Sequence, residues 1–218
     1  MATARKPQPP RKPIKVGDDH TFRWVVIALV AILAIGTGIG VWATTRGDGS
    51  TDPTVSAPPT AGADWAAQAA AIPGIVDDRS KNFTANHVTG PVAYANTPPI
   101  GGDHNPVWQN CMGDVYDGRI ANENAVHSLE HGAVWITYEP GLAADQREVL
   151  ASKVRGVPYT MMSRYPDQGS KISLQAWSWQ LKVDDADDPR IDGFIRTLRI
   201  NASQEPGAAC SGGVTKVL

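Results

Sequence analysis

Residues 123–138 read Glu-Asn-Ala-Val-His-Ser-Leu-Glu-His-Gly-Ala-Val-Trp-Ile-Thr-Tyr. The first nine have helical spacing, with Val126 and Leu129 on one side and the histidines and glutamates on the other. Gly132 follows at the place where a glycine ends a helix, and the β-branched and aromatic residues after it are typical of a buried strand. We therefore expect a packed helix-strand unit whose helix presents a polar face.

The polar face of this expected helix holds two histidines, His127 and His131, one helical turn apart. Side chains at positions i and i+4 lie one above the other on a helix, so both imidazoles can bind a single metal ion. Glu123 and Glu130 share this face, where they could be a further ligand or accept hydrogen bonds that fix the histidine tautomers. A solvated polar helix face without a ligand is the alternative interpretation.

A long segment rich in glycine, proline and asparagine, residues 86–118, precedes the helix. Irregular segments of this length in a compact domain are usually functional or held in place by other groups. This segment carries His87 and His104, which together with the helical pair make four of the chain's five histidines. We predict a transition-metal site formed by His104, His127 and His131, with His87 as a fourth ligand. Imidazole ligands suit Zn²⁺ or Cu²⁺, and no nucleotide cofactor is expected.

The segment from His127 to His131 also matches His-x-x-Glu-His, the pattern of a group of zinc proteases. In these enzymes both histidines hold zinc and the glutamate, here Glu130, acts as the catalytic base. They also need an acidic third ligand on a later helix and a substrate cleft, and the later acidic residues have no distinctive spacing. The sequence thus favours a binding protein, with a small zinc hydrolase as a remaining alternative.

Cys111 and Cys210 are the only cysteines of the chain. In an oxidising compartment a single pair most simply forms a disulfide. A bridge that closes a loop of about 100 residues contributes up to ~4–5 kcal/mol in the chain-entropy model. It would tie the C-terminal loop to the histidine-bearing segment. The alternative is that Cys111 and Met112 are soft copper ligands, which would leave Cys210 free.

The N-terminal region has the pattern of a membrane anchor. Residues 1–23 form a basic tail, and residues 24–43 contain no charged side chain. About 20 helical residues span roughly 30 Å, the thickness of the hydrocarbon core of a bilayer. We therefore expect one transmembrane helix in the plasma membrane, with the N-terminus in the cytoplasm and the main domain extracytoplasmic. A cleaved signal peptide is the alternative, although the apolar run exceeds the about 7–15 residues of a secretory signal.

The composition then divides the rest of the chain into two parts. Residues 44–63, rich in Pro, Ser, Thr and Gly, are typical of a linker, and residues 64–218 have the size of one domain. The expected elements are helices over 64–71, 123–131, 143–155 and 187–200, and strands over 91–94, 133–138, 159–163 and 172–183, the last as a strand or hairpin. The order β-α-β-α-β-β-α predicts an α+β domain with a mixed sheet covered by helices. A thioredoxin-like core has this order, although the Cys-x-x-Cys motif is missing.

Four segments resemble a family of bacterial proteins, the one numbered 3105 among domains of unknown function. They are His87–Tyr94, Thr97–Trp108, Glu123–Tyr138 and Glu205–Cys210. The resemblance covers roughly residues 64–213 and implies an actinobacterial protein with one membrane helix, on the outer face of the plasma membrane. It implies no activity. Residues 109–113 depart from a simpler glycine-rich version in that family, which speaks against Met112 as a ligand.

These patterns define three hypotheses for function. A net charge of -2 without a basic, aromatic-rich patch gives no reason to expect a nucleic-acid partner. The first hypothesis is a membrane-anchored protein with a histidine-rich transition-metal site, for metal handling or as a structural metal, and an accessory role in a cell-envelope complex. The second is a metal-free structural or interaction subunit of a membrane complex. The third is the zinc hydrolase.

Overall fold

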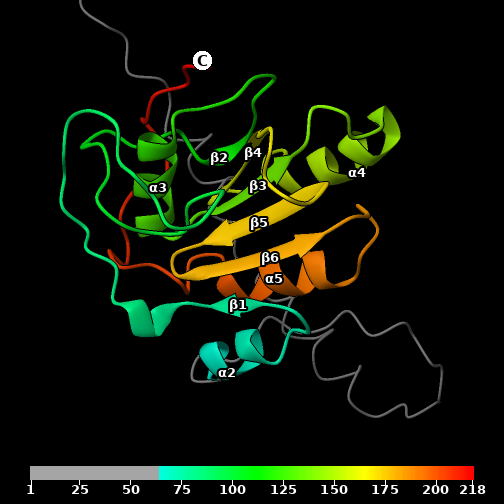
Figure 1. Ribbon diagram of the computed structural model, residues 1–218, viewed down its shortest axis with the longest axis horizontal. Helices are drawn as coiled ribbons and strands as arrows, with labels where there is room; N and C mark the ends of the chain where they lie inside the picture. Colours follow the sequence, from blue (N-terminus) through cyan, green and yellow to red (C-terminus); the bar gives the residue numbers. More distant parts are fainter. Residues whose placement is uncertain (1–63) are drawn as a thin grey trace, which may run out of the picture. The chain divides into compact units, whose positions relative to one another are not determined.

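The computed structural model describes residues 64–218, which Figure 1 draws in colour. The basic tail 1–23, the transmembrane helix expected over 24–43 and the linker 44–63 lie outside the described residues. Among the helices that are described, each is too short or too polar to cross a bilayer.

Within residues 64–218, six strands form one mixed sheet in the order β1-β6-β5-β3-β4-β2. The strands are β1 (Val76–Asp77), β2 (Met112–Val115), β3 (Val134–Tyr138), β4 (Thr160–Arg164), β5 (Ile172–Ala176) and β6 (Trp179–Val183). β3, β4 and β2 are parallel to one another, whereas β5 is antiparallel to both β3 and β6, and β1 is antiparallel to β6. At the centre, Ile136 pairs with Met162 on one side and Leu174 on the other.

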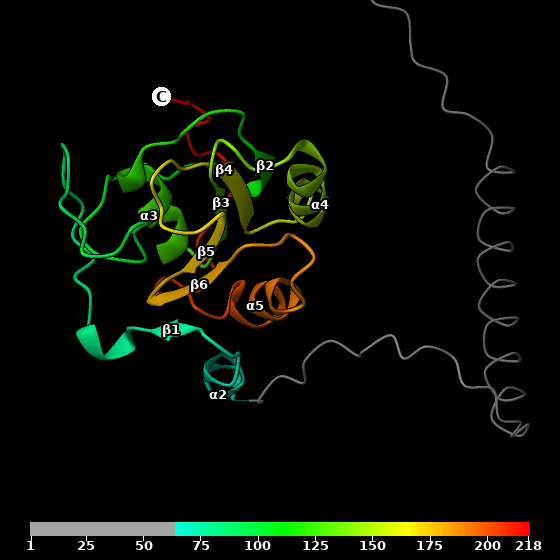
Figure 2. The ribbon, with the colours of Figure 1, turned by 45° about the vertical axis from the view of Figure 1, so that its right-hand side comes forward.

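Helices cover both faces of this sheet (Figure 2). They are α2 (Trp65–Ala70), α3 (Asn122–Glu130), α4 (Ala144–Val154) and α5 (Arg190–Leu198), and a short 3₁₀ turn lies at Arg79–Lys81. The buried side chains of α2, α4 and α5 pack into one apolar cluster, and those of α3 pack into a second cluster. α3, which carries the polar face of interest, therefore lies alone on its side of the sheet among the described helices.

Strand β3 connects the two clusters. Successive side chains of a strand point to opposite faces of the sheet, and here Val134 and Ile136 join the cluster of α4 and α5 while Trp135 joins the cluster of α3. All five residues of β3 are buried. The sequence shows this arrangement as an apolar run without polar alternation, which is typical of a strand covered on both faces.

The end of α3 is fixed by Gly132. Its φ of 97° lies in the left-handed region that glycine adopts without strain. A Cβ atom here would come within 3.1 Å of backbone atoms of Ile200 and 3.0 Å of the Cβ of Ser203. Gly132 therefore ends the helix and also lets the segment after α5 lie directly against it.

The predicted helices all exist, each within a few residues of the expected bounds, and the segment 172–183 forms the hairpin β5-β6. The strand predicted over 91–94 is wrong. Pro91 has no amide hydrogen, and the amide of Val92 donates to the Glu123 carboxylate rather than to a strand. β2 takes its place, and the order from β2 to α5 is β-α-β-α-β-β-β-α, the predicted order with its last strand divided into the hairpin β5-β6. The α+β class with a mixed sheet is confirmed, whereas the comparison with a thioredoxin-like core stays a prediction.

The two cysteines form a disulfide. Cys111, next to the start of β2, is bonded to Cys210 in the C-terminal loop, and the backbone amide of Cys111 also donates to the carbonyl of Cys210 at 3.0 Å. The alternative in which Cys111 is a thiolate ligand is thereby wrong, because both sulfur atoms are committed to the bridge.

Candidate metal centre

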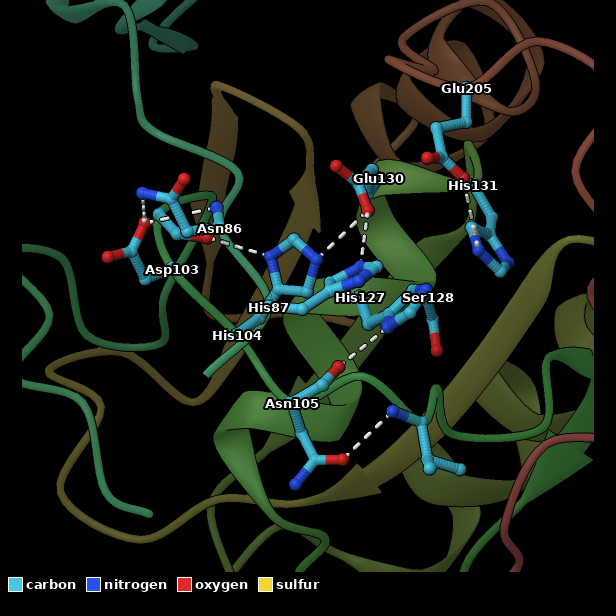
Figure 3. A network of polar contacts seen from close by, with 12 residues as sticks. Asn86, His87, Asp103, His104, Asn105, His127, Ser128, Glu130, His131 and Glu205 are labelled. Atoms are coloured by element: carbon cyan, nitrogen blue, oxygen red, sulfur yellow. Dashed lines mark hydrogen bonds and ion pairs between the residues drawn. The ribbon is translucent and has the colours of Figure 1, made fainter. Parts of the chain in front are cut away.

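Four side chains on the α3 side of the sheet converge on one point (Figure 3). They are His87 and His104 from the long irregular segment and His127 and Glu130 from α3, and each offers one ligand atom. These four atoms all lie within 4.8 Å of one another. The structure thus brings together three of the four predicted histidines.

The long segment folds back on itself to place its two histidines side by side. Residues around His87 and His104 form a parallel bridge, in which the amide of Val88 donates to the His104 carbonyl and the amide of His104 donates to the Asn86 carbonyl. The carboxylate of Asp103 accepts from both the backbone amide and the side-chain amide of Asn86, at 3.1 and 3.0 Å. The rings of His87 and His104 consequently lie with their centroids 5.0 Å apart.

The same segment is held on α3 by hydrogen bonds. The Glu123 carboxylate accepts from the amide of Val92 at 3.0 Å, and the Ser128 hydroxyl donates to the carbonyl of Gln109 at 2.7 Å. Glu123 was expected to orient a histidine or to be a ligand; instead it holds the irregular segment. This explains how a segment with so little regular structure is ordered beside the helix.

Backbone carbonyls fix the orientation of the buried imidazoles. The Nδ1 atom of His104 lies 2.8 Å from the carbonyl oxygen of Gly102, and the Nδ1 atom of His127 lies 2.6 Å from that of Asn105. A carbonyl oxygen only accepts hydrogen bonds, so in both neutral rings Nδ1 carries the hydrogen and Nε2 has the free lone pair. Metal-binding histidines are oriented in this way.

Glu130 faces these lone pairs. Its Oε2 atom lies 2.9 Å from Nε2 of His104 and 3.7 Å from Nε2 of His87. A carboxylate oxygen and an imidazole lone pair are both acceptors, so their short contact requires a shared proton or a shared cation between them. A bound cation would therefore satisfy both groups at once.

Burial keeps His127 in the form that binds metal. His104 and His127 are buried, and burial, together with the neighbouring imidazoles, lowers the pKa of His127 to about 4. Its ring is therefore neutral near pH 7. His87, by contrast, has a side chain that is 45% exposed, so the site opens to solvent on that side.

A family model described as a protein of unknown function, DUF3105, matches residues 87–212. The chain belongs to this family. The matched region begins at His87 and includes all four converging residues and both cysteines. No curated protein and no solved structure matches the chain. The family description assigns no activity.

His131, a predicted ligand, lies beside the converging group of this DUF3105 domain rather than in it. Its Nδ1 atom contacts the carbonyl oxygen of Ala209 at 2.8 Å, and its Nε2 atom lies 3.7 Å from Oε2 of Glu205. Its ring meets that of His127 edge-on, with centroids 4.5 Å apart. The structure places the carboxylate of Glu130 where the sequence analysis expected this imidazole.

Aromatic side chains surround the imidazoles of the DUF3105 domain. The ring of Trp177 lies 6.0 Å from that of His104, and the ring of Trp108 lies 5.7 Å from that of His127. These tryptophans were not predicted as part of the site, since nothing in their sequence spacing connects them with the histidines. Met112 lies on β2, outside the converging group. The four residues of this group offer only nitrogen and oxygen atoms as ligands.

Proposed function

We propose that the DUF3105 domain binds one divalent transition-metal ion through His87, His104, His127 and Glu130. The observation that carries this proposal is the contact of the Glu130 carboxylate with Nε2 of His104, a ring whose Nδ1 is already committed to a carbonyl. An ion bound between them would replace two opposed acceptors by two metal-ligand bonds.

The distances support this proposal. Ligands about 2.0–2.2 Å from a tetrahedral ion lie roughly 3.4 Å from one another. The ligand atoms of the four residues lie within 4.8 Å of one another. To bind one ion together, they would have to move by about an ångström, which side-chain rotation allows. The exposed side chain of His87 is the one most free to move, because the other three ligands are buried.

The donor set favours Zn²⁺ or Cu²⁺ as the proposed ion. Three imidazoles and one carboxylate are borderline ligands, whereas Mg²⁺ and Ca²⁺ prefer oxygen alone and Cu⁺ prefers sulfur. A structural zinc site is closed and buried, but here one ligand is exposed. This exposure gives the ion a route in and out, which supports metal handling over a permanently buried structural ion.

The proposal also includes a location for the domain in the cell. The uncharged run 24–43 after a basic tail supports a single-pass plasma-membrane protein whose DUF3105 domain lies outside the cell. In that position the domain would bind or pass on a metal as an accessory subunit of an envelope complex in an actinobacterium. The metal-free interaction subunit is the alternative. The hydrolase is less favoured, because Glu130 lies among the proposed ligands and has no position as a separate base.

Elemental analysis tests the proposal directly. The full chain, purified in detergent without a histidine tag and dialysed against Zn²⁺ or Cu²⁺, should retain one ion per chain. A variant with His104→Ala and His127→Ala should retain none, whereas the matched change His131→Gln should leave the metal content unchanged. Equal metal content in wild type and the double variant would refute the site and favour the metal-free subunit.

A further inference from the structure

A second site is indicated on the other side of the sheet. An open groove of about 290 Å³ lies beside α4, the helix that packs on the face opposite to α3. Its lining includes residues at the carboxyl ends of β2, β3 and β4, namely Val115, Tyr138 and Arg164. These three strands are parallel, and ligands of open α/β sheets bind at the carboxyl ends of parallel strands.

Two arginines in this groove have no partner among residues 64–218. Arg155 forms a two-bond ion pair with Glu148, one bond being 2.9 Å long. Among residues 64–218, the side chains of Arg147 and Arg164 form no hydrogen bond or ion pair, and the Nε atom of Arg147 is buried without an acceptor. A buried donor without an acceptor is destabilising, so an acceptor supplied by a ligand would stabilise the groove.

The charges of the groove indicate what that acceptor is. Its lining contains three guanidinium groups and two carboxylates, those of Asp117 and Glu148, which leaves one net positive charge. A ligand with a single negative charge neutralises this groove, whereas a doubly charged phosphate would leave it with a net negative charge. Guanidinium groups bind carboxylates through pairs of parallel hydrogen bonds.

The rest of the lining consists of apolar side chains and two tyrosines. Val115, Ala151 and Met162 border the groove next to the arginines. Val115 and Ala144 are exposed in the groove, whereas Ala151 and Met162 are buried at its base. A ligand with an apolar body would cover Val115 and Ala144 and remove their surface from water. We propose that the groove binds a small organic monoanion whose carboxylate lies between Arg147 and Arg164 and whose apolar body packs against β2 and α4. This site is independent of the metal centre, which lies on α3.

Equilibrium dialysis of the full chain in detergent against labelled benzoate tests the proposal. Benzoate combines a carboxylate with an apolar ring, benzamide has the same shape without the charge, and inorganic phosphate has more charge without the ring. We expect saturable binding of about one benzoate per chain with a Kd in the millimolar range or below. Benzamide and phosphate should each bind at least about tenfold more weakly.

Matched arginine variants complete the experiment. Arg164→Gln and Arg147→Gln should each weaken benzoate binding at least about tenfold, whereas Arg196→Gln, which changes an exposed arginine of α5 outside the groove, should not. Arg164 is itself exposed, so its variant keeps the test valid if Arg147→Gln fails to fold. Non-saturable binding, equal binding of benzamide, preference for phosphate or retention of benzoate in Arg164→Gln would each overturn the proposal.

Discussion

The Nε2 atom of His104 lies 2.9 Å from Oε2 of Glu130, and its Nδ1 atom donates to the carbonyl of Gly102. The first contact joins the irregular segment to the last turn of α3. Because both facing atoms are acceptors when the ring is neutral and the carboxylate is charged, the pair is complete only with a proton or a metal ion.

Glu130→Gln separates metal binding from folding. The amide of glutamine can donate to Nε2 of His104, so the metal-free variant should be at least as stable as the metal-free wild type. It loses an anionic ligand, however, so its metal affinity should fall by at least about 100-fold. Urea unfolding after chelation and competition with a metal-sensitive dye measure these two quantities.

Glu123→Gln is the matched control for this change. It removes a carboxylate from the same helix, but this carboxylate accepts a hydrogen bond from the amide of Val92 and does not belong to the converging group. Its effect should be the reverse, with metal affinity nearly unchanged and some loss of stability. A Glu130→Gln variant that binds metal as tightly as the wild type would refute Glu130 as a ligand.

Metal removal should lower thermal stability. An ion at about 100 times its Kd stabilises the folded state by ~2.7 kcal/mol, and for a domain of this size each kcal/mol shifts Tm by about 2–4 °C. Chelation should therefore lower Tm by roughly 5–10 °C in calorimetry of the full chain. The variant with His104→Ala and His127→Ala should show the same Tm with and without chelator.

The sequence predicted the parts of the site that depend on local spacing. Val126 and Leu129 gave the apolar face of α3, and Gly132 gave its end. The sequence could not show whether Glu130 or His131 joins the converging group. Both residues lie about one helical turn after His127, and only tertiary contacts decide which of them faces the other ligands. Those contacts are the Ala209 carbonyl for His131 and the imidazole of His104 for Glu130.

The same limit explains the errors in the strands. Residues 91–94 have strand-like composition, yet the Glu123 carboxylate takes up the backbone amide of Val92. β2, Met112–Val115, lies within the glycine-rich segment 86–118 and exists because it pairs with β4 at the edge of the sheet. Such pairing is between residues distant in the sequence, and a local pattern does not reveal it.

Acidification should destabilise the metal-free domain. The folded-state pKa of His127 is about 4, below the usual value near 6.5 in an unfolded chain. Between these two values the unfolded state binds more protons, so stability falls as pH decreases from about 6.5 toward 4. The total loss from this residue is up to ~3 kcal/mol. Burial lowers the pKa of His131 as well, which adds to the loss in the same direction.

Urea unfolding of the chelated chain at pH 7.5 and pH 5 measures this loss. In His127→Gln the difference between the two pH values should shrink, because the variant has no proton to gain at this position. An unchanged pH dependence in this variant would assign the acid sensitivity to other groups.

The disulfide should stabilise the fold without contributing to the metal affinity. Cys111 and Cys210 are 99 residues apart, so their bridge restricts the unfolded chain by up to ~4–5 kcal/mol in the chain-entropy model. The variant with both cysteines changed to serine should lose stability of this order in urea unfolding. Its metal affinity at a temperature where it is folded should change by less than about tenfold, because the bridge adjoins Ala209, the partner of His131, and not a proposed ligand. A much larger loss of affinity would bring His131 back into the ligand set.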